Sequence, residues 1–173
     1  SPIPLNTSEK TFSTMSLFQI DKIVYDINEN INDKLVSVYS SLANFGSSAI
    51  LVVSSNKKGV SFYLGTRDTN RPDVAKSILK KSLKGNFPGI NINEKNALEI
   101  EKFLENKIPD AYSNMAITSV SIVPSMRDEE EKNHFVQGIE KFIDSMAGEN
   151  YTAIFISSPL SKQNLENKKR GYE

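Results

Sequence analysis

The spacing of apolar and polar positions in the first half of the chain predicts alternating strands and helices. The stretch FQIDKIVYDI (18–27) is rich in β-branched and aromatic residues, which favours a strand. Apolar residues then recur at helical spacings of four and three, and Gly46 follows them: Ile31, Leu35, Val38, Leu42 and Phe45. This pattern predicts a helix that ends at the glycine.

A hairpin and a second helix follow. Two apolar runs, 49–53 and 60–64, flank a polar turn that ends in glycine, which predicts a β-hairpin. Pro72 suits the first turn of a helix, and Gly85 is predicted to terminate that helix. Residues 87–93 are predicted to form a turn and then a strand or extended segment. The resulting β-α-β-β-α-β order is the ferredoxin-like pattern.

The second half predicts an α-β-α-β extension. Residues 94–108 and 127–149 have amphipathic helical patterns, and Gly148 ends the second helix. Residues 116–126 and 151–159 are strand candidates, and the continuous apolar run of the second predicts burial on both faces. Strand, helix and strand predict a right-handed crossover between parallel strands. We therefore expect an α/β (α+β) fold, a mixed sheet with helices packed on it.

The pattern also predicts three parts of the chain. Residues 1–16 are polar and contain two prolines, which indicates an extended arm, and 17–160 form a single α/β domain. Residues 161–173 end within a helical pattern without a stop signal. We expect them to begin a helical connector to a missing downstream region.

Composition narrows the function classes. The 21 basic residues balance the 21 acidic residues, so no global field attracts nucleic acid or an anionic membrane. The absence of cysteine excludes disulfides and thiolate metal sites. No apolar run reaches the ~20 residues that a membrane span needs. We expect a cytoplasmic protein without membrane insertion.

Motifs for catalysis are missing. Neither G-x-x-x-x-G-K-[ST] nor G-x-G-x-x-G occurs, so no nucleotide or other cofactor site is expected in these residues. His134 is the only histidine, which argues against metal sites built on paired imidazoles. A small α/β hydrolase, with a serine near His134, is the weakest hypothesis, because no G-x-S-x-G elbow occurs. The chain is therefore predicted not to be an enzyme.

Two groups of residues are candidate contact sites. Lys76, Lys80 and Lys84 lie four apart on one helix face, and Lys81 adds to them. This face could contact a phosphate backbone, or it could simply offset the helix dipole and stay solvated. The turn formed by Phe87, Pro88 and Gly89 either anchors Phe87 in the core or forms a docking corner.

Three stretches resemble large bacterial ATPases of the HerA/FtsK type. They are VSFYLGTRD…AKSILKKSLKGNFPGI, SVSIVPSMRDEEEKNHFVQGIEKFIDSMAGENYTAIFISSPLS and the final RGYE. The resemblance covers about residues 48–173, most of the chain. In that family, a region of this kind precedes the P-loop motor core. The strings NFPGI and FVQGIEKFIDSMAG are distinctive but carry no known chemistry. The Walker motifs that perform ATP hydrolysis in the family have no counterpart in this sequence.

The resemblance implies a non-catalytic N-terminal assembly or docking domain of an ATPase that translocates DNA or another substrate. ATP and Mg²⁺ would then belong to the parent protein. The implied partners are the chain's own downstream ATPase domain, further copies in a homo-oligomer, and DNA through the parent. The alternative hypothesis is a nucleic-acid-binding module that uses the face of Lys76, Lys80 and Lys84.

Overall fold

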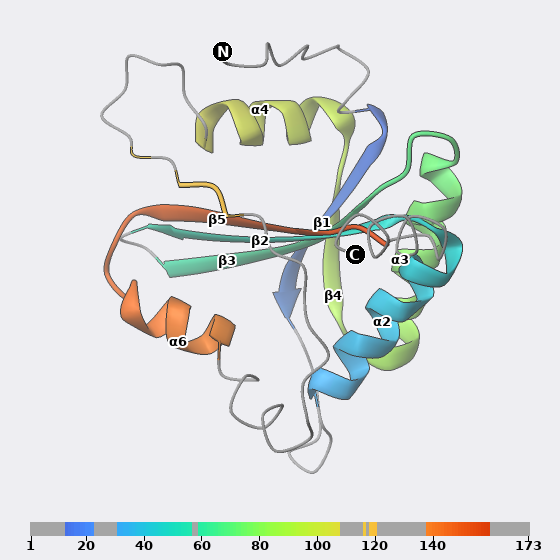
Figure 1. Cartoon of the computed structure of the whole chain (residues 1–173), viewed down its shortest axis with the longest axis horizontal. Coiled ribbons are helices and arrows are strands. Elements are labelled where there is room, and N and C mark those ends of the chain that lie inside the picture. The colour runs from blue at the N-terminus through green and yellow to red at the C-terminus, as the bar shows by residue number, and fades with distance from the viewer. Residues whose placement is uncertain are drawn as a thin grey trace, which may run out of the picture.

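Five strands form one sheet in the computed structural model, which describes residues 13–22, 31–56, 59–107, 116, 118–120 and 138–159. The strand order is β4-β1-β3-β2-β5, and neighbouring strands in these residues all run antiparallel (Figure 1). The strands are β1 (Met15–Lys22), β2 (Ser48–Asn56), β3 (Gly59–Arg67), β4 (Asn91–Lys95) and β5 (Tyr151–Ser157).

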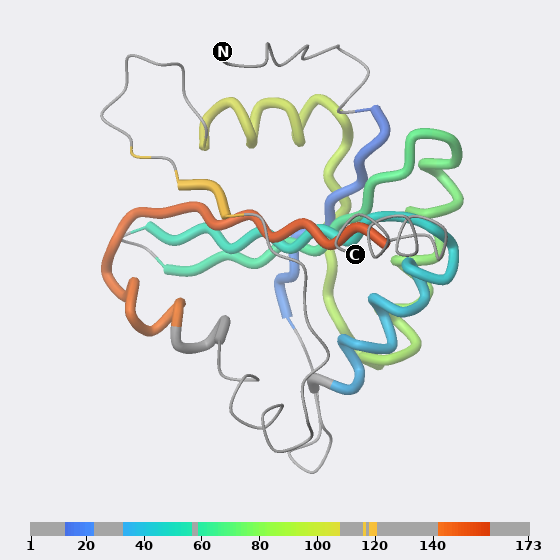
Figure 2. The backbone as a smooth tube through the Cα atoms, viewed as in Figure 1, coloured from blue at the N-terminus to red at the C-terminus, as the bar shows by residue number. Residues whose placement is uncertain are grey.

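Four described helices cover the two faces of the sheet. They are α2 (Ile31–Phe45), α3 (Pro72–Asn86), α4 (Ala97–Lys107) and α6 (Gly138–Ser145). Figures 1 and 2 show α4 on one side of the sheet and α2 and α6 on the other. Strands β1 to β4 with α2 and α3 have the ferredoxin-like arrangement, which confirms the predicted α+β class. None of the described helices has the length and hydrophobicity that crossing a membrane requires.

The larger apolar layer lies between the sheet and the helices α2 and α3. Successive side chains of a strand point to opposite faces, so Phe18 enters this layer while Leu17 enters the other. Leu64 joins Phe18 from the sheet, and the helices contribute fully buried residues at helical spacing: Val38, Leu42, Leu79 and Leu83. Val38 and Leu42 belong to the hydrophobic stripe predicted for the first of these helices, so that stripe supplies its buried face.

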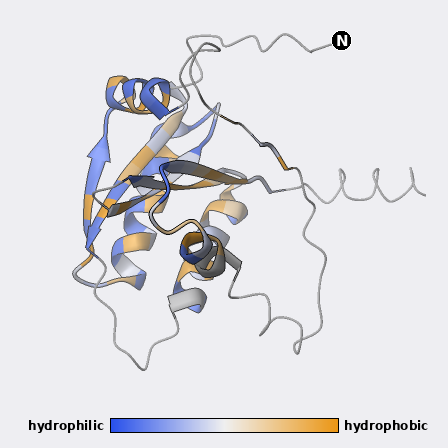
Figure 3. Cartoon of the chain, turned by 90° about the vertical axis from the view of Figure 1, so that its left-hand side faces the viewer, coloured by the Kyte–Doolittle hydropathy of each residue, from blue (hydrophilic) through white to orange (hydrophobic). Residues whose placement is uncertain are grey.

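A second apolar layer lies under α4. Ile100 of this helix is buried against Leu17, Ile50 and Tyr63, and the ring of Phe103 lies 4.7 Å from that of Tyr63, centroid to centroid. Figure 3 shows hydrophobic and hydrophilic residues interleaved along the strands and helices, the pattern of elements with a buried side. The central strands are thus covered on both faces.

Polar contacts join the end of α2 to the start of α3. The Asp68 carboxylate accepts hydrogen bonds from the backbone N–H groups of Asn70 (2.9 Å) and Arg71 (2.8 Å) and from the Ser47 hydroxyl (2.7 Å). The Ser47 hydrogen bond, and then the one from Arg71, lower the pKa of Asp68. The Arg71 guanidinium lies 3.8 Å from the ring centroid of Phe45 and donates to its carbonyl oxygen at 3.1 Å.

Several predicted boundaries are corrected. Strand β1 begins at Met15, inside the arm predicted over 1–16, whose first twelve residues lie outside the described residues. Helix α3 continues through Gly85 to Asn86, and strand β4 starts only at Asn91. Gly46 does end α2, with a φ of 88° that favours glycine.

The prediction that residues 151–159 are buried on both faces is wrong. Strand β5 lies at the edge of the described sheet, and Ile156 is 67% exposed. The predicted parallel partner, 116–126, is described only at residues 116 and 118–120, which lie outside any strand. The prediction of a mixed sheet depends on that segment, most of which lies outside the described residues. The connector predicted over 161–173 also lies outside them.

We predict opposite effects from adding one methyl group at two glycines. A Cβ at Gly65, in the central strand β3, would lie 2.5 Å from the Ser16 carbonyl oxygen, whereas a Cβ at Gly85 in α3 meets nothing within 4 Å. Gly65→Ala should therefore lower the free energy of unfolding by about 1–3 kcal/mol. Gly85→Ala should raise it by up to ~1 kcal/mol through helix propensity. Urea unfolding of both variants measures the difference, and equal effects would contradict the close strand approach.

Candidate functional site

The predicted lysine face is partly neutralised by an acidic residue from the sheet. The Glu94 carboxylate of β4 lies 3.0 Å from the Lys80 ammonium and 3.2 Å from that of Lys76. Lys76 also lies 3.5 Å from Asp73. The hydrogen bond from Lys80, and after it the one from Lys76, lower the pKa of the Glu94 carboxyl. The hydrogen bond to Glu94 likewise raises the pKa of Lys76.

This arrangement weakens the lysine face as a phosphate-binding surface. Lys76 and Lys80 are held against Glu94, whereas Lys81 and Lys84 are exposed. A phosphate that bound Lys76 and Lys80 would meet the Glu94 carboxylate between them, and opposing charges at such distances cancel much of the local field. The structure therefore brings two of the four lysines, Lys76 and Lys80, together around the carboxylate of Glu94.

The turn at Phe87 anchors the core. Phe87 is fully buried, its backbone N–H donates to the Leu83 carbonyl oxygen at 2.9 Å, and its own carbonyl accepts from Ile90 at 3.0 Å. Gly89 has a φ of 83°, which turns the chain towards β4, and Pro88 and Gly89 are exposed. The Phe87 side chain is thus unavailable to a partner, and a docking corner can involve only the other two residues.

The hydrolase hypothesis finds no support in the part of the chain that the structure describes. His134 lies outside the described residues. Ser158, which follows β5, shares a 2.9 Å hydrogen bond with the hydroxyl of Ser48. Within the described ranges, no group of three or more metal-ligating side chains is close enough to hold a metal ion.

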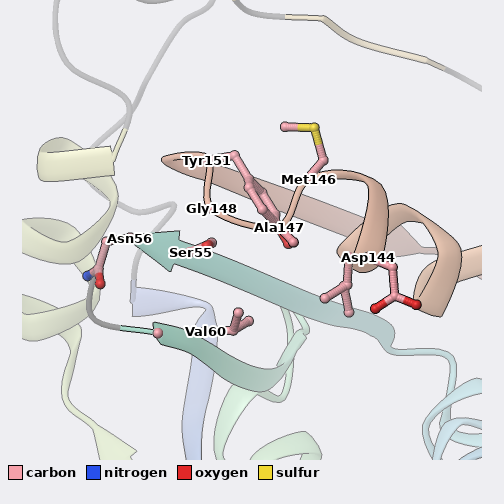
Figure 4. Close-up of a pocket in the computed structure, with 10 residues that line it drawn as sticks. Ser55, Asn56, Val60, Asp144, Met146, Ala147, Gly148 and Tyr151 are labelled. Atoms are coloured by element: carbon pink, nitrogen blue, oxygen red, sulfur yellow. The ribbon is translucent and has the colours of Figure 1, made fainter.

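A hollow of about 360 Å³ lies between α6 and the β2–β3 hairpin (Figure 4). Its lining includes Ser55, Val60, Asp144 and Tyr151. The Tyr151 hydroxyl oxygen is buried and has no hydrogen-bond partner in the described residues. The Tyr151 ring is held edge-on by Phe142 of α6 at a centroid distance of 5.4 Å, and Phe142 also lies 6.3 Å from the ring of Phe155. Aromatic contacts thus join α6 to β5.

The most distinctive described surface is strand β5. Ile154 is 37% exposed and Phe155 is 39% exposed, besides the more exposed Ile156. Among the described strands, β5 pairs only with β2, and its seven residues contain neither a charge nor a proline. Sequence reasoning identified the apolar run but assigned it to the interior, because a buried strand and an apolar edge strand have the same local pattern.

Comparisons with known proteins identify no relative of this chain. No protein-family model matches it, and no curated protein or solved structure matches it significantly.

We predict that Glu94→Gln lowers the free energy of unfolding by an amount that depends on pH. This dependence measures what the pairs of Glu94 with Lys76 and Lys80 contribute to stability. The folded-state pKa of Glu94 lies below its ordinary value of 4.5, so the pairs stabilise the fold above that pH and the stabilisation is lost as pH falls. Because the side chains of Glu94, Lys76 and Lys80 are substantially exposed, the free energy of unfolding of the variant should be about 0.2–1 kcal/mol lower at pH 7. The difference should become progressively smaller in acid. Urea unfolding at several pH values measures this, with Glu105→Gln on the exposed side of α4 as control. A pH-independent difference would contradict the pairing.

A second prediction concerns the Tyr151 hydroxyl. A buried hydroxyl without a partner costs roughly 1–3 kcal/mol, so Tyr151→Phe should stabilise the chain by about 1 kcal/mol. Thermal unfolding measures the change, and Tyr39→Phe, in the apolar layer between the sheet and α2, serves as a matched substitution. A loss of stability in Tyr151→Phe would mean that the hydroxyl has a partner.

Proposed function

We propose that this chain is a non-catalytic assembly domain from the N-terminal region of a HerA/FtsK-type ATPase. The observation that carries the proposal is the exposed, uncharged edge strand β5, with Ile156 two-thirds exposed. An edge strand offers a row of backbone N–H and C=O groups to another extended segment. Such a strand supports a role in binding another polypeptide.

The features that normally protect a sheet edge are missing from β5. Natural proteins blunt such edges with charged residues, prolines, bulges or very short strands. Strand β5 is seven residues long, and its register with β2 runs without a shift from Ala49 opposite Ser157 to Ser55 opposite Tyr151. A regular apolar edge of this length is a liability for a protein that acts alone, and it is useful to one that assembles.

The parent protein is proposed from the resemblance of NFPGI and FVQGIEKFIDSMAG to the region before the motor core of these ATPases. ATP and Mg²⁺ would be bound by the downstream domain, and DNA would be engaged through the parent. The nucleic-acid alternative has weaker support, because Glu94 already pairs with Lys76 and Lys80. A cytoplasmic location follows from the same proposal.

The proposal predicts that assembly of the full-length protein depends on β5. Its reading frame should encode a G-x-x-x-x-G-K-[ST] motif beyond Glu173. In that protein, Ile156→Lys should weaken subunit association about ten- to hundredfold, since burying an isoleucine contributes ~1.5–3 kcal/mol. Sedimentation velocity measures the association.

Leu98→Lys is the matched control, because Leu98 is 58% exposed on α4 and lies away from β5. Unchanged assembly in Ile156→Lys would contradict the role of the edge. A frame without the P-loop motif would contradict the parentage.

A further inference from the structure

We infer that the segment bound by β5 is the β5 strand of a second copy of this chain, related by a two-fold axis. The inference rests on the proposed assembly function and names the partner and the register. The two five-stranded sheets would join edge to edge into one continuous antiparallel sheet.

Symmetry and strand length determine the register. A two-fold axis perpendicular to the sheet makes the two strands antiparallel and keeps each face of one sheet continuous with the same face of the other. The seven residues of β5 then overlap completely only when the axis passes beside the middle residue, Ile154. Ile154 faces its own copy, Ala153 faces Phe155, Thr152 faces Ile156, and Tyr151 faces Ser157.

The side chains in this register complement one another. Ile154 pairs in the sheet with Val52, which belongs to the layer under α4, so Thr152, Ile154 and Ile156 share that face. Each Ile156, the most exposed large hydrophobic residue of the strand, would be covered from the side by Thr152 of the copy. On the opposite face, the small Ala153 lies across from the large Phe155. Cross-strand pairs of this kind stabilise antiparallel sheets.

Charge distinguishes β5 from the other edge of the sheet. Strand β4 carries Glu94 and Lys95, and charges on an edge strand oppose pairing with another edge. Strand β5 has no charged residue, and the chain has a net charge of zero, so two copies approach without long-range repulsion. A second β5 strand therefore meets no charged side chain at β5, whereas at the β4 edge it would meet Glu94 and Lys95.

The chain's own segment 116–126 is the competing occupant. Its described residues lie outside any strand and are exposed, and Val120 is 76% exposed. These four residues belong to no strand, and within the described part of the chain β5 pairs with β2 only. The second copy is therefore the occupant that the described residues favour, and the experiment separates the two.

The test uses the absence of cysteine from the chain. Ile154→Cys places one thiol at the two-fold axis, where opposite residues lie within disulfide reach of their symmetry mates. Under mild oxidation of the 173-residue chain, we expect a disulfide-linked dimer to form at least about tenfold faster than in Val36→Cys, a control on α2 that is 60% exposed. Adding Ile156→Lys should remove this advantage, and circular dichroism confirms that each variant is folded.

Light scattering and hydrogen exchange of the unmodified chain complete the experiment. A dimer with slow exchange at the outward amides of β5 supports the inference. A monomer with fast exchange there overturns it, while leaving the edge free for another partner as the proposed function requires. A monomer with slow exchange overturns both, because the chain then covers its own edge. A dimer whose Ile154→Cys cross-link forms no faster than the control also overturns the inference.

Discussion

The structure depends on the alternation of side chains across the central strands β1, β3 and β2. Neighbouring residues such as Leu17 and Phe18 enter different apolar layers, one under α4 and the other under α2 and α3. Because the period of a strand is two, a slip of one residue would move every side chain to the wrong layer. Because both faces of the sheet are covered by apolar layers, a change of register would disrupt both layers. The register in turn fixes which strand side chains each helix packs against.

The same constraint explains why glycine occupies position 65. Strand β3 lies between β1 and β2, and Gly65 pairs with both Leu17 and Ile50. The absence of a side chain lets the Leu17 side chain and the Ser16 carbonyl approach the backbone closely. A close approach of neighbouring strands thus falls at the centre of the sheet, while the hollow beside Tyr151 lies near β5 and α6.

The two edges of the sheet have different surface chemistry. At β4, Glu94 binds two lysines of α3, so the edge is charged and tied to its own helix. At β5, the exposed side chains are uncharged and include Ile154, Phe155 and Ile156. A charged edge resists strand addition and an apolar edge favours it, so the two ends of the sheet differ in their suitability for pairing with another strand. The lysine pattern that suggested nucleic-acid binding is, in the structure, part of what distinguishes the two edges.

Local sequence patterns were sufficient for the ferredoxin-like half. The stripe from Ile31 to Phe45 and the two apolar runs of the hairpin match the observed elements, because burial of one face dictates the spacing of apolar residues. The helix predicted from Pro72 is also observed. Burial of Phe87 was anticipated as one of two readings of its turn. Tertiary structure decided the rest. Whether YTAIFIS is interior or edge depends on neighbouring strands, and whether Lys80 is free depends on Glu94, which lies fourteen residues away in sequence but 3.0 Å away in space. Such choices arise from pairing between distant segments, and local periodicity does not encode them.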